Sequence, residues 1–339
     1  MISNFIIQNW LEITAVIFAI FCIGGSFGGG NAAQSNQATV VLKELMGLES
    51  TGAGFWIGVI MAIIVGVIII GGIKRIAQVT EKVVPFMAVL YLLACLYILG
   101  ANFSLIDDAV SLIFREAFNP TAIGVGGVIG VLLVGFKRAA FSNEAGAGSA
   151  SIAHSAVKTK YSASEGLVAL LEPFIDTVVI CTMTALVIII FNFGGDASGA
   201  TIFQYGGDGA GAVMIDGVAY EGAGITSKAF AQYIPYSNVF LTVAVVLFAV
   251  STMISWSYYG LQSWKFLFGR GKAADMAYKL LFLLFVIIGA SASMNSIWAF
   301  SDAMIFAMVF PNMVGLYFLF PVVKKQLKRY TDAIKESNA

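Results

Sequence analysis

The residues best suited to chemistry lie in segment 141–155, FSNEAGAGSASIAHS, where Glu144 and the single histidine, His154, stand among small residues. We expect a membrane span that is broken near 141–146, with 145–157 as its second half-helix. Broken helices of this kind form substrate and ion sites in secondary transporters. A carboxylate buried there would be costly and therefore functional. The alternative is a loop carboxylate in the cytoplasm, which the two basic residues just before the segment favour.

A second unusual segment, 24–37, reads GGSFGGGNAAQSNQ and contains five glycines and four amides without a charge. Lipid tolerates no unsatisfied backbone, so we expect an interruption of the first span that lines protein or a wet cavity. The alternative for the glycines is close helix packing through small residues. That alternative does not explain the amides Asn31, Gln34, Asn36 and Gln37, which we expect to face a polar interior.

Hydroxyl groups form a third candidate site. Ser251, Thr252 and Ser255 recur at helical spacing beside Trp256, and their oxygens suit Na⁺, a hard cation. The alternative is that these hydroxyls bond carbonyls of their own helix, as Ser and Thr commonly do. Asp176 raises the same question in an earlier span, where a solvated position near the span's end is the alternative.

Enzyme motifs are missing. The sequence has no GxGxxG, GxxxxGK[ST] or HExxH pattern, and its three cysteines lie far apart in apolar runs. We therefore expect neither catalysis nor a zinc site. The 19 basic and 19 acidic residues cancel, which argues against a nucleic-acid partner. A channel is disfavoured because no position stands out for a ring of acidic side chains.

The elements that must hold these residues are membrane spans. The chain of 339 residues is 59% hydrophobic and only 11% charged, with a mean hydropathy of +0.89. A span needs about 20 mostly apolar residues. Eight stretches without charge fit, at 13–42, 50–73, 83–106, 117–136, 177–195, 229–264, 280–301 and 303–323.

The loops between these spans predict the orientation. Most of the 19 Lys and Arg residues fall in alternate loops and in the tail 324–339, which the positive-inside rule places in the cytoplasm together with both chain ends. The long loop 192–238 is then extracellular, with a small hairpin expected around 213–220. Segment 104–118 is amphipathic and predicts a short helix in the outer interface.

Several of these segments together resemble the sodium:alanine symporter family, the alanine or glycine:cation symporters also called amino acid carrier proteins. The resemblance rests on GFKRAAFSNEAGAGSASIAHS at 135–155, FGGGNAAQSN at 27–36 and FAVSTMISWSYYG at 248–260. Segments 166–188 and 85–99 fit as well. The likeness covers nearly the whole chain apart from 192–238.

The resemblance implies an all-α membrane protein with a leucine-transporter-like inverted-repeat fold, formed by residues 1–339 as one transporter domain. It implies Na⁺-coupled symport of a small neutral amino acid, alanine or glycine, across a bacterial plasma membrane, with lipid around the bundle. Na⁺ would be the coupling ion. Carried over by position, the substrate-binding residues would be Gln34, Phe141, Ser142, Asn143, Gly146 and Trp256, and the Na⁺ ligands Ser251 and Thr252.

The sequence departs from the family pattern at its beginning. Family members have about eleven spans, and their first broken helix carries a Gly-Thr-Gly-Asn motif upstream of the position of Ile13. That motif does not occur here. We therefore expect a symporter that lacks the first three spans. The alternative is a non-transporting remnant or accessory subunit that needs a partner to supply the missing helices.

Overall fold

The structure is a computed structural model, which describes residues 2–50, 52–118, 135, 139, 142–144, 146–194, 201–203 and 212–337. Within these residues, seven helical segments are long and apolar enough to cross a membrane. They coincide with seven of the eight predicted spans. The predicted fourth span, 117–136, lies almost entirely outside the described residues. The candidate spans are Leu11–Met46, Ala53–Ile70, Gly72–Ala101, Ser162–Asn192, Ser237–Phe268, Lys272–Ser291 and Met294–Ser337.

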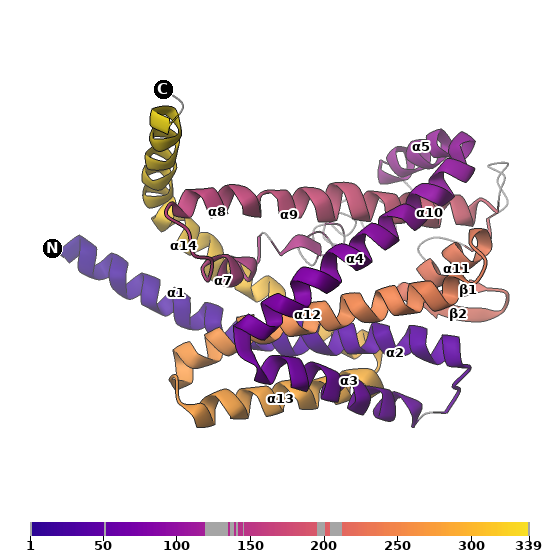
Figure 1. Ribbon diagram of the computed structural model, residues 1–339, viewed down its shortest axis with the longest axis horizontal. Helices are drawn as coiled ribbons and strands as arrows, with labels where there is room; N and C mark the ends of the chain where they lie inside the picture. Colours follow the sequence, from indigo (N-terminus) through magenta and orange to yellow (C-terminus); the bar gives the residue numbers. More distant parts are fainter. Residues whose placement is uncertain are drawn as a thin grey trace.

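The described part of the chain is mostly helical, with one two-stranded hairpin (Figure 1). The elements in chain order are α1 (Ile2–Phe27), η1 (Gly28–Ala32), α2 (Ala33–Met46), α3 (Ala53–Ile70), α4 (Gly72–Ala101), η2 (Phe103–Leu105), α5 (Ile106–Ala117), α7 (Ala150–His154), α8 (Ser162–Ala169), α9 (Leu171–Pro173), η3 (Phe174–Cys181), α10 (Thr182–Asn192), β1 (Ala212–Ile215), β2 (Val218–Glu221), α11 (Ala223–Tyr233), α12 (Ser237–Phe268), α13 (Lys272–Ser291) and α14 (Met294–Ser337).

Helix α12 lies at the centre of the bundle. It packs against α1, α2, α4 and α13, while α3 packs along α13 and α1 along α14 (Figure 1). The interface of α1 with α13 is aromatic: the ring of Phe27 stacks on Phe285 at 4.7 Å and on Tyr278 at 5.5 Å between centroids. Many outward-facing side chains are large and apolar, as expected for helices whose solvent is lipid.

The first span is not broken, contrary to the expected interruption within 24–37. Helices α1 and α2 continue into one another through the π-helical turn η1. The helix is therefore continuous and is only wider over this glycine-rich turn. The reason is packing: the backbone of η1 is buried, and a Cβ atom at Gly28 would press on Phe300 and Ser301 of α14. The small-residue alternative therefore explains the glycines.

Two of the four amides of this span, Asn31 and Asn36, differ from expectation, whereas Gln34 lines the polar cavity described below. Asn31 donates to the carbonyl of Phe282 (2.7 Å), and Asn36 donates to those of Gly289 (3.0 Å) and Ala292 (2.9 Å). They bind the backbone of α13 and do not face a polar interior, because a neighbouring helix supplies the acceptors that lipid lacks. Gln37 accepts from the backbone N–H of Ala223 (2.8 Å).

Two smaller predicted elements are present. Strands β1 and β2 pair antiparallel with Val213 opposite Tyr220, which confirms the hairpin around 213–220. Helix α5 confirms the helix expected within 104–118, and Asp107 and Asp108 in its first turn complement the helix dipole.

The seventh span begins earlier than its charge-free stretch suggested. Helix α13 starts at Lys272 and ends at Ser291, whereas the prediction was 280–301. Two of its three charges pair with each other: Asp275 binds Lys279 one turn on (2.8 Å), and it also binds Lys265 of α12 (2.6 Å). A helix end can therefore hold three charges that a search for uncharged stretches excludes.

Candidate functional site

A cavity of about 390 Å³ lies where α12 meets the η1 turn, α4, α14 and the segment 142–144. Its walls come from parts of the chain that are far apart in sequence. The lining residues are Gly29, Gln34, Thr80, Val84, Met87, Ser142, Glu144, Glu172, Asp176, Phe248, Ser251, Thr252, Ser255, Trp256, Tyr259 and Ile305. We call this the central cavity.

The central cavity is acidic. Glu144, Glu172 and Asp176 line it, and no Lys, Arg or His occurs among its described lining residues. A cleft lined by one sign of charge concentrates ligands of the opposite sign. The cavity therefore suits a small cation, an ammonium group, or both.

One wall of the central cavity carries hydroxyl groups from α12. Ser251 donates to the carbonyl of Phe248 (2.9 Å), and Ser255 donates to that of Ser251 (3.0 Å). Both hydrogen bonds stay within the helix, which is the alternative considered from the sequence. A hydroxyl that donates in this way still offers oxygen lone pairs to a cation. Thr252 lies between these serines and lines the same cavity.

Another part of the cavity wall, Ser142 and Glu144, lies where the chain leaves helical geometry. Glu144 has a φ of 55° and Gly148 a φ of 87°, and the carbonyl of Glu144 accepts from the N–H groups of Ala147 (3.0 Å) and Gly148 (3.1 Å). This turn agrees with the break predicted near 141–146. The helix that follows, α7, has five residues and is shorter than the half-helix expected over 145–157.

Other elements hold the segment in place. Asn143 donates to the hydroxyl of Thr177 in η3 (2.8 Å), and the hydroxyl of Ser142 donates to the carboxylate of Asp176. On the other side, Asn312 of α14 donates to the carbonyl of Gly146 (3.1 Å). The segment is therefore fixed between two spans.

Trp256 of α12 forms part of the wall of the central cavity. It is buried, with 3% of its surface exposed, and its ring lies edge-on to Tyr259 at 5.5 Å between centroids. Its indole nitrogen donates to the Oε1 atom of Glu144 at 2.6 Å. Gly30 lies directly behind the indole, where a Cβ atom would overlap the ring.

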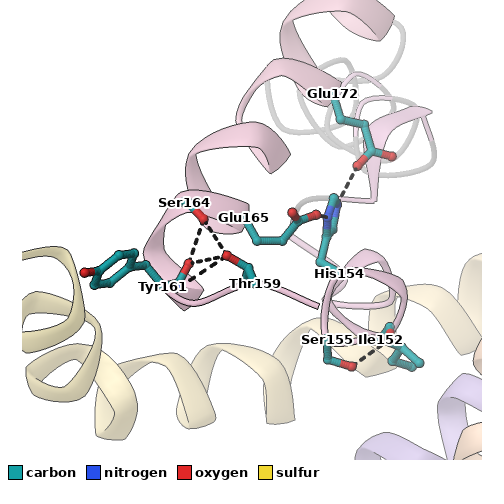
Figure 2. Close-up of polar contacts among 8 residues, drawn as sticks. All are labelled: Ile152, His154, Ser155, Thr159, Tyr161, Ser164, Glu165 and Glu172. Atoms are coloured by element: carbon teal, nitrogen blue, oxygen red, sulfur yellow. Dashed lines mark hydrogen bonds and ion pairs between the residues drawn. The ribbon is translucent and has the colours of Figure 1, made fainter. Parts of the chain in front are cut away.

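A second cavity, of about 490 Å³, adjoins the central one, and Glu144 and Glu172 line both. Its wall includes His154, whose Nδ1 atom lies 2.7 Å from Glu165 Oε1 and whose Nε2 atom lies 3.5 Å from Glu172 Oε2 (Figure 2). The imidazole thus links α7 to α8 and α9. Figure 2 also shows Thr159, Tyr161 and Ser164 hydrogen-bonded to one another at the start of α8.

These contacts predict a pH-dependent stability. Burial lowers the pKa of His154, but the hydrogen bonds to Glu165 and Glu172 outweigh burial and raise the pKa above its ordinary value. Protonation of His154 therefore stabilises the folded state. This stabilisation is fully present below about pH 6.5 and is lost as the pH rises through the raised pKa. We expect the free energy of unfolding of His154→Gln to be below that of the wild type at pH 5.5, by less than about 1 kcal/mol, and the gap to close by pH 9.

Thermal unfolding in detergent at several pH values measures this effect. Glu165→Gln removes the nearer carboxylate and should remove most of the pH dependence as well. A gap between wild type and His154→Gln that stays constant from pH 5.5 to pH 9 would contradict the assignment.

The structure brings together most of the site residues expected from the sequence. Gln34, Ser142, Ser251, Thr252 and Trp256 all line the central cavity. Asn143 lines the second cavity, and Gly146 is exposed outside the lining of both. Phe141 lies outside the described residues.

Sequence reasoning missed part of the central cavity. Glu172 was not singled out, and Asp176 was considered equally suited to a solvated position; both line the cavity. The signal that could have found them is that an acidic residue inside a span marks a substrate or ion pathway, since both lie within the candidate span Ser162–Asn192. Thr80 and Met87 of α4 carried no such signal.

The chain matches a known protein family over almost its whole length. A sequence model of the sodium:alanine symporter family matches residues 2–339. The chain is 36% identical to the sodium/alanine symporter AgcS of Methanococcus maripaludis over 325 residues, which are 96% of this chain and 66% of that protein.

Two further relatives are named for a different coupling ion or a different substrate. The sodium/proton-dependent alanine carrier protein of Bacillus sp. PS3 is 32% identical over 82% of this chain and 62% of its own length. The probable sodium/glutamine symporter GlnT of Bacillus subtilis is 28% identical over 96% of this chain and 62% of its own length. The chain thus spans about two thirds or less of each of these relatives.

Proposed function

Because this chain belongs to the sodium:alanine symporter family, we propose that it takes part in Na⁺-coupled symport of a small neutral amino acid, alanine or glycine, across the plasma membrane. The family makes it a multi-span membrane transporter and not an enzyme. The specific proposal rests on the acidic central cavity. Hydroxyl groups of α12 line it, and so does Glu144, which lies in the turn where helical geometry ends.

The substrate's ammonium group would lie near the carboxylates of the central cavity. Its carboxylate would face the amide of Gln34, and Ser142, whose hydroxyl donates to Asp176, would hold the Asp176 carboxylate near the ammonium group. The amide nitrogen of Gln34 donates to the carbonyl of Gly29 (3.1 Å), and its second N–H remains for a ligand. Trp256 would limit the side chain to a small one. A methyl group changes affinity by only about 1–3 kcal/mol, so alanine and glycine are proposed together.

Na⁺ would bind to oxygens of Ser251 and Thr252 on α12, which line the cavity together with Gly29 of the η1 turn. The residues fit the ion, since hydroxyl, carboxylate and backbone oxygens are what a hard cation takes. Bound Na⁺ would supply positive charge beside the acidic wall, so the ion and the amino acid would share one cavity.

The proposal includes the architecture that the family resemblance implies. The helices would form a leucine-transporter-like inverted repeat with both chain ends in the cytoplasm. The loop 192–238 would be extracellular and the tail 324–339 cytoplasmic. This orientation is supported by the clustering of Lys and Arg residues in alternate loops.

Replacing Thr252 with valine tests the Na⁺ site. The change keeps the shape of the side chain and removes one oxygen, so we expect the Na⁺ concentration for half-maximal alanine binding to rise about tenfold. Alanine affinity at saturating Na⁺ should change little. Scintillation proximity binding of radiolabelled alanine to the purified chain, at increasing Na⁺, measures both quantities.

Thr242→Val is the matched control, because Thr242 lies on the same helix, is buried, and does not line the central cavity. Its hydroxyl donates to the carbonyl of Val41 (3.4 Å). If both variants show the same Na⁺ dependence as the wild type, the Na⁺ assignment on α12 is wrong. If the alanine affinity of the wild type does not depend on the Na⁺ concentration, the proposed coupling is refuted.

A further inference from the structure

Glu144 uses both oxygens of its carboxylate. Oε1 accepts from the indole nitrogen of Trp256 and Oε2 accepts from the hydroxyl of Ser149, each at 2.6 Å. The first bond crosses from the broken segment to α12, and the second ties the carboxylate to the start of α7. Hydrogen bonds to an ionised acceptor are roughly twice as strong as neutral ones.

The backbone around Glu144 is fixed as well. A φ of 55° is uncommon for a residue other than glycine and is retained only where the surroundings enforce it. Here the carbonyl of Glu144 holds the two N–H groups of the turn, and Asn312 of α14 holds the carbonyl of Gly146. The carboxylate therefore projects from a rigid support.

The indole of Trp256 needs such a partner. The residue is 97% buried, and a buried N–H without an acceptor costs the full desolvation of the group. Gly30 lies behind the ring and Tyr259 beside it, so the remaining freedom of the indole is rotation away from Glu144. The same indole forms a wall of the central cavity.

We propose that Glu144 is a positioning residue: its carboxylate holds the Trp256 indole as the fixed wall of the central cavity. Its role is that of a hydrogen-bond acceptor, and the negative charge that attracts a cation is supplied mainly by Glu172 and Asp176. The expected effect on ligand binding rests on the proposed function. The contact between Glu144 and Trp256 is independent of that function.

The variants Glu144→Gln and Glu144→Ala separate acceptor from charge. Glutamine keeps an oxygen for the indole, whereas alanine leaves the indole unpaired. The readout is the indole N–H resonance of Trp256 in ¹⁵N-tryptophan-labelled protein, one of five such signals and assigned by its loss in Trp256→Phe. We expect Glu144→Ala to move or broaden this resonance and Glu144→Gln to restore most of it.

Glu172→Gln is the matched control, since Glu172 lines the same cavity but pairs with His154. It should leave the indole resonance in place. A resonance unchanged in Glu144→Ala, or changed equally by Glu172→Gln, would overturn the proposal. These outcomes do not depend on transport.

Alanine binding then tests the consequence for the ligand. The half-saturating alanine concentration should rise about tenfold in Glu144→Ala and about twofold in Glu144→Gln. If the glutamine variant loses as much affinity as the alanine variant while its indole stays in place, the charge is what matters and the positioning role is wrong. If the wild type binds no alanine, the proposed function fails and the resonance still decides the contact.

Discussion

Replacing Gly289 with alanine is expected to destabilise the protein by about 3 kcal/mol, at the upper end of what overpacking usually costs. A Cβ atom at Gly289 would overlap the Cα and carbonyl oxygen of Ala32 in η1. Both partners are backbone, so neither can turn aside, and separating the helices would also break the hydrogen bond from Asn36 to the Gly289 carbonyl. The buried thiols of Cys22 and Cys95 allow unfolding to be followed with a thiol-reactive dye during heating.

Gly315→Ala is the control for this substitution. Gly315 lies inside α14 with no atom within 4 Å of a Cβ placed there, so alanine should be neutral or stabilise the helix by up to about 1 kcal/mol. A Gly289→Ala protein that unfolds at the same temperature as the wild type would show that η1 and α13 do not approach as closely as described.

Gly30→Ala is expected to lower alanine affinity by up to about 100-fold, because overpacking costs about 1–3 kcal/mol and each 1.4 kcal/mol is about a factor of ten in affinity. The new methyl group would overlap the indole of Trp256 and push it into the central cavity. The hydrogen bond between Trp256 and Glu144 would be lost with it. Radiolabelled alanine binding at saturating Na⁺ measures the loss.

Gly25→Ala provides the comparison on the same helix and against the same tryptophan. Its Cβ atom would meet Trp256, Ile305 and Met308 at 3.4 Å, close to ordinary contact. We expect affinity within about threefold of the wild type. Equal affinity in both glycine variants would mean that the indole does not form the cavity wall.

Hydropathy and charge predicted much of the fold because lipid constrains it strongly. Seven of the predicted spans, the hairpin around 213–220 and the turn after Asn143 are present in the described residues. Each depends on a local rule: a span must be apolar, and small or polar residues must fill a break. The boundaries of α13 were less predictable, since Asp275 pairs with Lys279 of the same helix and, through a tertiary contact, with Lys265 of α12.

The continuity of the first span could not be predicted from its own sequence. Its glycines and amides are equally compatible with a broken helix and with a helix that packs closely on polar backbone. The choice depends on α13, some 250 residues away, whose carbonyls accept from Asn31 and Asn36. No pattern within 24–37 contains that information.

The candidate site was predictable in part for the same reason. The residues carried over from the family resemblance include five that line one cavity, whereas Glu172 reaches it because α9 and η3 lie beside the broken segment. The pairing of Glu144 with Trp256 joins positions 112 residues apart. Such contacts follow from packing and not from spacing.

Na⁺-dependent uptake of [¹⁴C]alanine into proteoliposomes containing this 339-residue chain tests the central claim most directly. We expect saturable uptake that is driven by an inward Na⁺ gradient and collapses when Na⁺ is replaced by K⁺. Cys22 and Cys95 should remain protected from thiol reagents, which shows that the reconstituted protein is folded. Folded protein that takes up no alanine in a Na⁺ gradient would contradict the claim that this chain carries out the transport.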